Sequence, residues 1–353
     1  MNRTELRQTF FLEGLPRLWC PLISHYTGSG EFDPSRTRAH MVQMSPWVNS
    51  FLVPGSTGDG WEMRPDERLG LVDIVRDIVD DIGGALLIGV LETEQGAAAR
   101  ELQTLKNRYP ADGSGSVCGA VVTAPKGSSL SQETIYAELA EMLDAGLPTA
   151  LYQLPQITEN EVAPETAARL ADEYGNLYLL KDTSGGDRIA EAGVMPKDLF
   201  MVRGAEGDYL RWYRGAGGPY DGFLLSTANG FAPQLSRIIS LADEAGEADE
   251  TEGAGIPALS LRRDSAYAEA EELSKLLSRV VASCFELSAD LRFGNPFANS
   301  NKAVDHWMAY GPGGAGKTPP MTHSGNRLPA DFVRRVGDIL RDAGMLPESG
   351  YLE

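Results

Sequence analysis

Short apolar runs rich in β-branched residues recur along the chain, and stretches of helical periodicity separate them. The runs are continuous rather than alternating, which is typical of parallel strands buried on both faces. Eight such runs within about 210 residues predict a closed (β/α)₈ barrel, the TIM barrel of the α/β class. A doubly wound open sheet is the alternative. The runs are Trp19–Ile23, Ser50–Val53, Leu86–Leu91, Val117–Val122, Thr149–Leu154, Leu177–Leu180, Phe200–Val202 and Gly222–Leu225.

The stretches between the runs place Leu, Ala, Glu and Arg at intervals of three and four residues, the spacing of amphipathic helices. Clear examples are 65–81, 134–145 and 163–174. After the eighth run the pattern changes, because three further helical stretches follow with no strand between them. These are Arg263–Cys284, Asn299–Tyr310 and Pro329–Ala343. We therefore expect a C-terminal helical extension after the barrel.

An acidic segment separates the barrel from this extension. Ala242–Gly253 carries six carboxylates and no basic residue, and we interpret it as a solvated loop. The sequence thus predicts a (β/α)₈ barrel at 1–240, an acidic Gly-rich loop at 241–262 and a C-terminal helical region at 263–353.

The charge balance and the cysteines narrow the class of partner. The chain has 31 basic and 50 acidic residues, a formal charge of −19, which disfavours nucleic acid or an anionic membrane as partner and favours a small molecule. Cys20, Cys118 and Cys284 form no metal-binding or disulfide pattern, so we expect no metal site. Without an apolar run of membrane-spanning or export-signal length, we expect a cytoplasmic protein.

Reactive side chains follow three of the predicted strands, and in a barrel of this kind the carboxyl ends of strands carry the catalytic groups. Lys181 comes directly after the apolar run Leu177–Leu180. Partial desolvation there favours the neutral amine, the form that attacks a carbonyl carbon to make an imine. The alternative is a lysine that ends its strand and extends into water.

The second and fifth predicted strands end in groups that suit a small acid. Gly55, Ser56 and Thr57 form a tight turn whose hydroxyls and amide groups suit a carboxylate, although an ordinary capping turn is the alternative. Tyr152 offers a phenol that can relay a proton, with a buried tyrosine bonded to the backbone as its alternative.

Together these segments resemble the class I, Schiff-base aldolases of the dihydrodipicolinate synthase and N-acetylneuraminate lyase superfamily, over nearly the whole chain. The matching segments are GSTGD at Gly55–Asp59, YQLP at Tyr152–Pro155, LLKDTSGGD at Leu179–Asp187, Gly204 with Glu206, and Ser226–Asn229. Several motifs in the right order are far more specific than any one of them.

The resemblance implies a role for each site residue. Lys181 is expected to form the imine with pyruvate or another 2-oxo acid, Ser56 and Thr57 to hold its carboxylate next to Gly55 and Gly204, and Tyr152 to shuttle the proton. An aldehyde is the second substrate. The resemblance implies no metal or organic cofactor, and a homo-oligomer that is a dimer or a tetramer.

Two departures from the family pattern leave the substrate open. The position at which dihydrodipicolinate synthases usually carry an arginine for the acceptor's carboxylate is Ile157, and Ala124–Gly127 replaces their usual aromatic pair. A 2-keto-3-deoxy sugar acid aldolase or dehydratase and an N-acetylneuraminate lyase-like enzyme are therefore alternatives. A barrel that binds a 2-oxo acid without turnover is a third.

Two further features receive a structural interpretation. Gly311–Thr318, GPGGAGKT, fits the phosphate-loop pattern, but that motif follows a strand and starts a helix, whereas here a helical stretch precedes it and Pro319 and Pro320 follow. We expect a flexible Gly-rich connection instead. His25, near the end of the first predicted strand, either faces the pocket or is a surface or hydrogen-bonded structural histidine.

Overall fold

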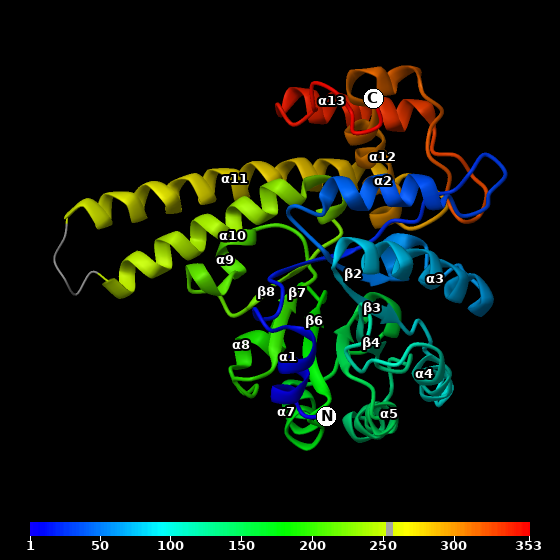
Figure 1. Ribbon diagram of the computed structural model, residues 1–353, viewed down its shortest axis with the longest axis vertical. Helices are drawn as coiled ribbons and strands as arrows, with labels where there is room; N and C mark the ends of the chain where they lie inside the picture. Colours follow the sequence, from blue (N-terminus) through cyan, green and yellow to red (C-terminus); the bar gives the residue numbers. More distant parts are fainter. Residues whose placement is uncertain (252–256) are drawn as a thin grey trace.

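The computed structural model describes the backbone of residues 1–251 and 257–353, and it contains a closed parallel barrel of eight strands in sequence order (Figure 1). Helices lie between consecutive strands on the outside of the barrel, so the predicted TIM barrel is confirmed. Each predicted run overlaps a strand, with ends shifted by at most a few residues. The strands are β1 Leu18–Pro21, β2 Ser50–Val53, β3 Ala85–Gly89, β4 Val117–Thr123, β5 Thr149–Gln153, β6 Leu177–Asp182, β7 Phe200–Arg203 and β8 Gly222–Leu224.

The continuous apolar character of the strands has a direct cause, because both faces of each strand are buried. Alternate residues belong to two different cores. One core packs between the strands and the surrounding helices, and the other fills the barrel with at least one residue of every strand. These inner residues are Trp19, Leu52, Leu87, Val121, Ala150, Leu179, Val202 and Leu224.

The helices begin and end at residues with a physical reason to do so. α3 has Pro65 at its first turn, the Glu67 carboxylate accepts a hydrogen bond from the Arg64 amide, and Gly83 ends the helix at a φ of 67°. The helices of the barrel are α1 Arg3–Phe10, α2 Pro34–Met44, α3 Pro65–Ile82, α4 Ala97–Arg108, α5 Gln132–Asp144, α6 Pro155–Thr158, α7 Pro164–Glu173, α8 Arg188–Ala192 and α9 Tyr209–Trp212. The sequence did not predict α1.

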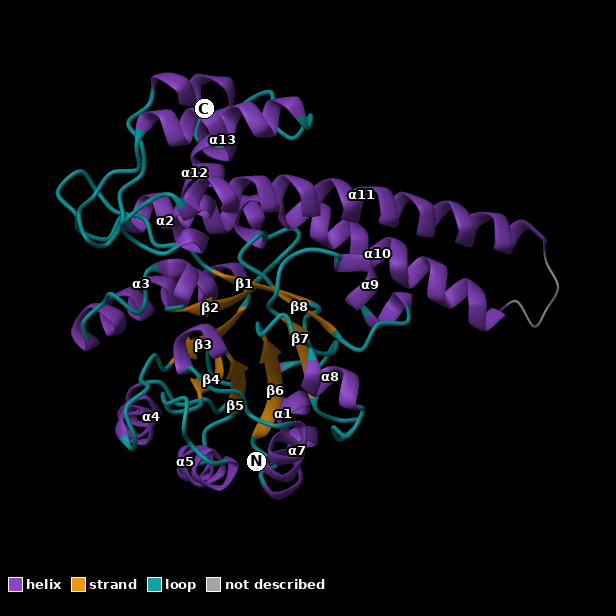
Figure 2. Ribbon diagram, turned by 180° about the vertical axis from the view of Figure 1, so that it is seen from behind, coloured by secondary structure: helices purple, strands orange, loops and turns teal. Residues whose placement is uncertain are grey.

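After β8 the chain is helical, as expected for the C-terminal extension. Its elements are α10 Ala228–Thr251, α11 Pro257–Ala289, α12 Pro296–Tyr310 and α13 Ala330–Asp342. Figure 2 shows α10 and α11 as two long helices that lie side by side and extend away from the barrel. In both views α12, α13 and the C-terminus lie beyond one end of the barrel, and the N-terminus lies at the other.

The acidic segment is the clearest correction to the predicted organisation. Residues 242–251 continue α10 where a loop was expected, and 252–256 lie outside the described residues. The physical reason is that Ala and Glu are strong helix formers and the start of the segment is buried, including Ala242 and Ala245. The division of the chain at 240 and 262 stays a prediction.

The phosphate-loop match lacks the structure that nucleotide binding requires. α12 precedes it, Gly311–Gly316 form a 3-10 helix, and the backbone is extended at Lys317. The segment is therefore not a phosphate loop, as expected from the sequence, and Gly311–Gly316 form a 3-10 helix where a Gly-rich connection was expected. Of the helices described, none is long and apolar enough to cross a membrane.

Candidate active site

Lys181 and Tyr152 lie next to each other at the carboxyl ends of neighbouring strands. They are register partners on β6 and β5, and each is only 4% exposed. The Nζ atom of Lys181 lies 3.9 Å from the centre of the Tyr152 ring. Among the described residues, nothing donates a hydrogen bond to this amine, accepts one from it or pairs with it as a carboxylate. The structure thus places a buried, unpaired amine against a phenol ring.

The turn after β2 brings Ser56 and Thr57 to the same end of the barrel. The Oγ atom of Ser56 accepts a hydrogen bond from Nε1 of Trp61 at 2.8 Å, which leaves its own hydroxyl hydrogen free to donate to a ligand. A Cβ atom at Gly58 would lie 2.5 Å from the carbonyl oxygen of Leu22. Only glycine allows the turn to approach the segment after β1 so closely.

The two glycines predicted to bind substrate have different surroundings. The carbonyl of Gly55 accepts two amide hydrogen bonds from its own turn at 3.0 Å, and Gly55 does not line the cavity described below. A Cβ at Gly204 would overlap Oγ1 of Thr183 and lie 2.7 Å from Cε of Lys181. Gly204 therefore makes room for the lysine side chain, and the Thr183 hydroxyl next to it is buried without a hydrogen-bond partner.

A single cavity of about 220 Å³ collects most of these groups. It takes residues from the ends of five strands, from the turn after β2 and from the start of α12. Five of the six predicted site residues line it together, and Gly55 alone is left out; the five are Lys181, Tyr152, Ser56, Thr57 and Gly204. The other lining residues are Pro21, Trp61, Leu154, Gln156, Ile157, Thr183, Leu224, Ser226, Asn295, Pro296 and Phe297.

Glu206, from the matched segment after β7, holds the strand ends together. Its carboxylate accepts hydrogen bonds from the hydroxyls of Ser226 and Thr227 at 2.7 Å each and from the Thr227 amide at 3.0 Å. The Tyr209 hydroxyl donates a further bond at 3.1 Å. Burial, reinforced by the carboxylate, raises the pKa of Tyr209 well above its ordinary value, so this phenol stays a donor.

The two departures from the family pattern have structural consequences. Ile157, where an arginine is usual, lines the cavity with an apolar side chain. Lys126, in the segment that replaces the aromatic pair, lies outside the cavity and pairs with Glu159 at 3.0 Å on the surface. No residue of 124–127 reaches the lining of this cavity.

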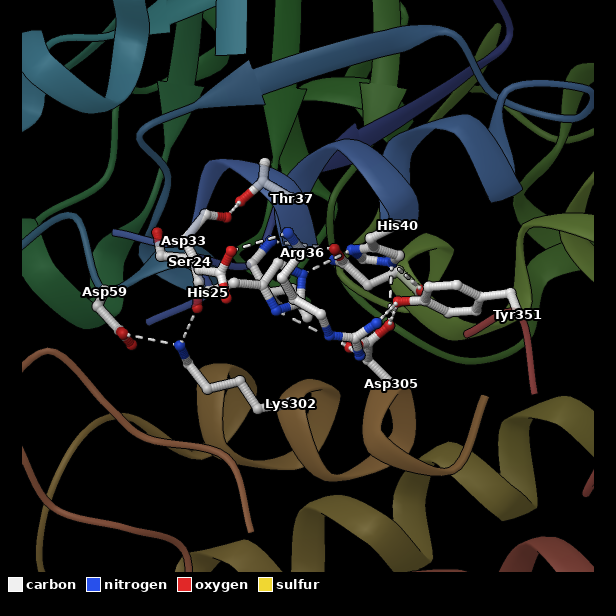
Figure 3. Close-up of polar contacts among 12 residues, drawn as sticks. Ser24, His25, Asp33, Arg36, Thr37, His40, Asp59, Lys302, Asp305 and Tyr351 are labelled. Atoms are coloured by element: carbon white, nitrogen blue, oxygen red, sulfur yellow. Dashed lines mark hydrogen bonds and ion pairs between the residues drawn. The ribbon is translucent and has the colours of Figure 1, made fainter. Parts of the chain in front are cut away.

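A second buried lysine, Lys302 of α12, was not predicted. Its Nζ lies 3.0 Å from Oδ2 of Asp59 and donates to the carbonyl of Ser24 (Figure 3). The Tyr26 hydroxyl donates to the same Asp59 oxygen at 3.1 Å. Asp59 ends the turn that carries Ser56 and has a φ of 60°. The C-terminal extension therefore holds this turn in place through a buried ion pair.

α12 also carries Asp305, which is the centre of a second hydrogen-bonded network. Its carboxylate accepts from Nη2 of Arg36 at 2.5 Å and from the Tyr351 hydroxyl at 2.7 Å (Figure 3). His25 and His40 contact each other at 3.1 Å, and Nε2 of His40 lies 3.4 Å from Asp305. His25 does not line the cavity that contains Lys181. Of the two alternatives that its sequence position left open, it is the hydrogen-bonded structural histidine.

Burial and charge set the protonation of this network in opposite directions. Burial lowers the pKa of both His25 and His40 below the ordinary value, more strongly for His25. Burial pushes the pKa of Asp305 upward, but the Arg36 guanidinium and the two histidines outweigh it and hold that pKa below its ordinary range. The network therefore contains one ionised carboxylate and two neutral imidazoles at neutral pH.

His25, His40 and Asp305 are the group among the described residues that could hold a metal ion. The donor atoms do not fit that use, because Arg36 and Tyr351 already occupy the carboxylate of Asp305. The Nε2 atom of His40 also lies 2.8 Å from the Asn229 carbonyl, so it donates there. A guanidinium next to the carboxylate repels a cation, and the group is better described as a closed polar network.

A family model described as the dihydrodipicolinate synthetase family matches residues 15–262. The chain belongs to this family. Its relatives include 4-hydroxy-tetrahydrodipicolinate synthase 1 of Streptomyces coelicolor, 28% identical over 237 residues, which are 65% of this chain and 72% of the relative. The corresponding synthase of Thermotoga sp. is 30% identical over 215 residues, 58% of this chain and 68% of the relative.

Solved structures share the fold. The prophage protein YagE of E. coli K12, in complex with pyruvate, superposes with a TM-score of 0.67 at 21% identity, over 93% of this chain and 98% of that one. A variant of 2-keto-3-deoxygluconate aldolase from Sulfolobus solfataricus gives a TM-score of 0.64 at 18% identity, over 93% and 96%. At these identities the likeness shows the shared fold alone.

Proposed function

We propose that the protein is a class I aldolase or lyase that holds pyruvate or a related 2-oxo acid as an imine on Lys181. The observation that carries the proposal is the unpaired Lys181 amine, buried against Tyr152 in a cavity that also contains the Ser56 and Thr57 hydroxyls. An amine that is not engaged in an ion pair is free to attack the carbonyl carbon of a bound 2-oxo acid.

The reaction begins with the binding of the carboxylate. The hydroxyls of Ser56 and Thr57 donate to it, which places the neighbouring carbonyl carbon at the Lys181 amine. Attack by the amine forms a carbinolamine, and loss of one water gives the protonated imine. Tyr152 carries the protons between the amine nitrogen and the departing oxygen.

The protonated imine then serves as an electron sink. When a C–H or C–C bond next to it breaks, the electron pair moves into the imine and an enamine forms. In cleavage, the enamine takes up a proton and water releases the 2-oxo acid. In synthesis, the enamine carbon attacks the carbonyl carbon of an aldehyde. These steps use only side chains of this chain, and no step needs a metal or an organic cofactor.

The test is the exchange of pyruvate methyl protons in deuterated water, followed by NMR. The account predicts enzyme-dependent exchange that Lys181→Ala abolishes, because exchange requires the enamine. A binding protein without turnover that still forms the enamine would exchange methyl protons without using any aldehyde. If the wild type exchanges no protons with pyruvate or with larger 2-oxo acids, the proposed function is wrong.

Two finer expectations accompany this proposal. The two open alternatives, a 2-keto-3-deoxy sugar acid aldolase or dehydratase and an N-acetylneuraminate lyase-like enzyme, use the same imine and differ in the second substrate. A cytoplasmic location and a dimeric or tetrameric assembly stay predictions.

A further inference from the structure

We infer that the second substrate of this cavity is an apolar aldehyde, aromatic or branched aliphatic, rather than a sugar aldehyde or one that carries an acid group. The inference rests on the proposed function and names its substrate class. It starts from the part of the cavity wall that the 2-oxo acid does not need, which is lined by Trp61, Leu154, Ile157, Leu224 and Phe297.

The first argument is charge. Lys181 is the one residue with an ionisable amine, guanidinium, imidazole or carboxylate among those that line the cavity, and the proposed reaction consumes its amine in the imine. No arginine, histidine or second lysine of the described residues is in the lining to pair with another carboxylate or a phosphate. An acid group on the acceptor would lose its water without a charged partner, and that loss weakens binding.

The second argument is that several polar atoms of the lining already have partners within the protein. Ser56 accepts from the Trp61 indole at 2.8 Å, and the amide of Asn295 donates to the Ser56 carbonyl at 2.7 Å. Ser226 donates to Glu206 at 2.7 Å. These bonds satisfy the indole N–H, so Trp61 contributes ring surface to the cavity. Apart from the groups assigned to the 2-oxo acid, the Thr183 hydroxyl is the buried polar group of the described lining without a hydrogen-bond partner, so most hydroxyls of a sugar chain would lack a partner.

The third argument is the exposure of Phe297 at the start of α12. Its side chain lines the cavity and is 39% exposed, and the Phe285 ring packs edge-on against it with centroids 5.1 Å apart. An aromatic side chain that is held by a neighbouring ring and is exposed to water at a cavity wall stabilises a bound apolar ligand, because binding removes apolar surface from water. Ile157 adds apolar surface at the position where the family usually has an arginine.

The substrate for cleavage is therefore a 4-hydroxy-2-oxo acid with an apolar group on C4. With this acid as an imine on Lys181, the C4 hydroxyl loses its proton to a base, the C3–C4 bond breaks and the aldehyde leaves. The electron pair of that bond forms the enamine, C3 takes up one proton, and one water releases pyruvate. The overall reaction converts one hydroxy-oxo acid into one pyruvate and one aldehyde.

The experiment compares two substrates on the full chain, 4-hydroxy-2-oxo-4-phenylbutanoate and 2-keto-3-deoxygluconate, and follows pyruvate release. We expect kcat/KM for the phenyl compound to be higher by about tenfold or more, the size of effect that burying an aromatic group gives. Phe297→Ser is expected to lower the phenyl value about tenfold with little effect on the sugar acid. Ile157→Arg is expected to lower it as well and to raise the use of aldehydes that carry a carboxylate.

Val194→Ser is the matched control, because Val194 is a 48% exposed apolar residue outside the cavity, and it should leave the preference unchanged. The inference is overturned if the wild type cleaves the sugar acid faster, or cleaves neither compound while it still exchanges the methyl protons of pyruvate. Loss of methyl exchange as well would instead show that the proposed function itself is wrong. Phe297 and Ile157 are not fully buried, so both variants are expected to fold. Thermal unfolding checks this.

Discussion

Two buried lysines lie at the same end of the barrel in opposite environments. Lys181 is 4% exposed, and its amine contacts the Tyr152 ring without an anionic partner among the described residues. Lys302 is 2% exposed, and its amine pairs with Asp59 at 3.0 Å. The difference teaches that burial alone does not mark a reactive lysine. An amine held in an ion pair has a structural role, whereas an unpartnered one in a cavity is available for chemistry.

The largest effect is expected when each lysine is replaced by methionine, which is apolar and similar in size. Lys302→Met leaves the buried carboxylate of Asp59 without its partner and should lower the free energy of unfolding by about 3–5 kcal/mol. Lys181→Met should change it by less than about 1 kcal/mol and lower pyruvate methyl exchange more than about 10³-fold. Denaturant titration and NMR measure the two properties. Equal destabilisation by both variants would remove the distinction between the two lysines.

A control separates the ion pair from simple loss of side-chain volume. In Lys302→Met with Asp59→Asn the unpaired charge is gone, so the double variant should recover part of the lost stability. No recovery would mean that Lys302 stabilises the protein through packing and its bond to the Ser24 carbonyl.

The next largest effect concerns the phenol that touches the unpaired lysine. Tyr152→Phe retains the ring that contacts Lys181 and removes the hydroxyl, so we expect methyl exchange to fall about 100-fold, as loss of a proton-transfer group does. The thermal midpoint should stay near that of the wild type. An unchanged exchange rate would assign the proton transfer to another group, for which the unpartnered hydroxyl of Thr183, which like Lys181 borders Gly204, is a candidate.

The paired region should respond to pH in a way that the cavity does not. Burial lowers the pKa of His25 and His40, which face Asp305, Arg36 and, for His25, Lys302. A base with a lowered pKa in the fold gives stability that is present above its unfolded value, about 6.5, and lost as the pH falls below it. The free energy of unfolding should therefore drop below pH 6.5, by up to about 1.4 kcal/mol per pH unit for each histidine.

Denaturant titrations at several pH values measure this slope. His25→Gln removes one of the two titrating groups, so its slope between pH 6.5 and 5 should be clearly smaller than that of the wild type, whatever its absolute stability. An identical slope would mean that His25 does not contribute to the pH dependence.

The smallest effect is expected at Gly204, which the sequence marked as a substrate contact. A Cβ there would lie 2.7 Å from Cε of Lys181, so Gly204→Ala should displace the lysine and lower methyl exchange about tenfold. Gly70→Ala is the matched control, because Gly70 lies in α3 and has open space around its Cβ position. Gly70→Ala should leave exchange unchanged.

The sequence predicted the barrel because a parallel strand buried on both faces needs apolar residues at every position. Such a run is recognisable in the sequence without knowledge of its neighbours. It also indicated Lys181, Tyr152, Ser56 and Thr57, since each lies at or just after the carboxyl end of a strand and the strand ends meet at one face. The acidic segment was wrongly interpreted because its charges suggested solvent, while helix propensity and packing of its first residues keep 242–251 in α10.

The network around Asp305 could not be predicted from local patterns. Asp305 binds Arg36 across 269 positions of the chain, and Lys302 reaches Ser24 across 278. The acceptor Asp305 and the donor Lys302 both lie on α12. This helix is buried around most of its circumference, so its sequence shows no apolar stripe to indicate which side faces the barrel. The partners become visible only when the C-terminal helices are placed over the barrel.

Reductive trapping with pyruvate and borohydride, followed by peptide mapping, tests the central claim most directly because both buried lysines are read in one experiment. The account predicts a single pyruvate adduct on the peptide that contains Lys181, none on the peptide that contains Lys302, and loss of the adduct in Lys181→Ala. An adduct on Lys302, or an unmodified Lys181 with pyruvate and with larger 2-oxo acids, would contradict the account.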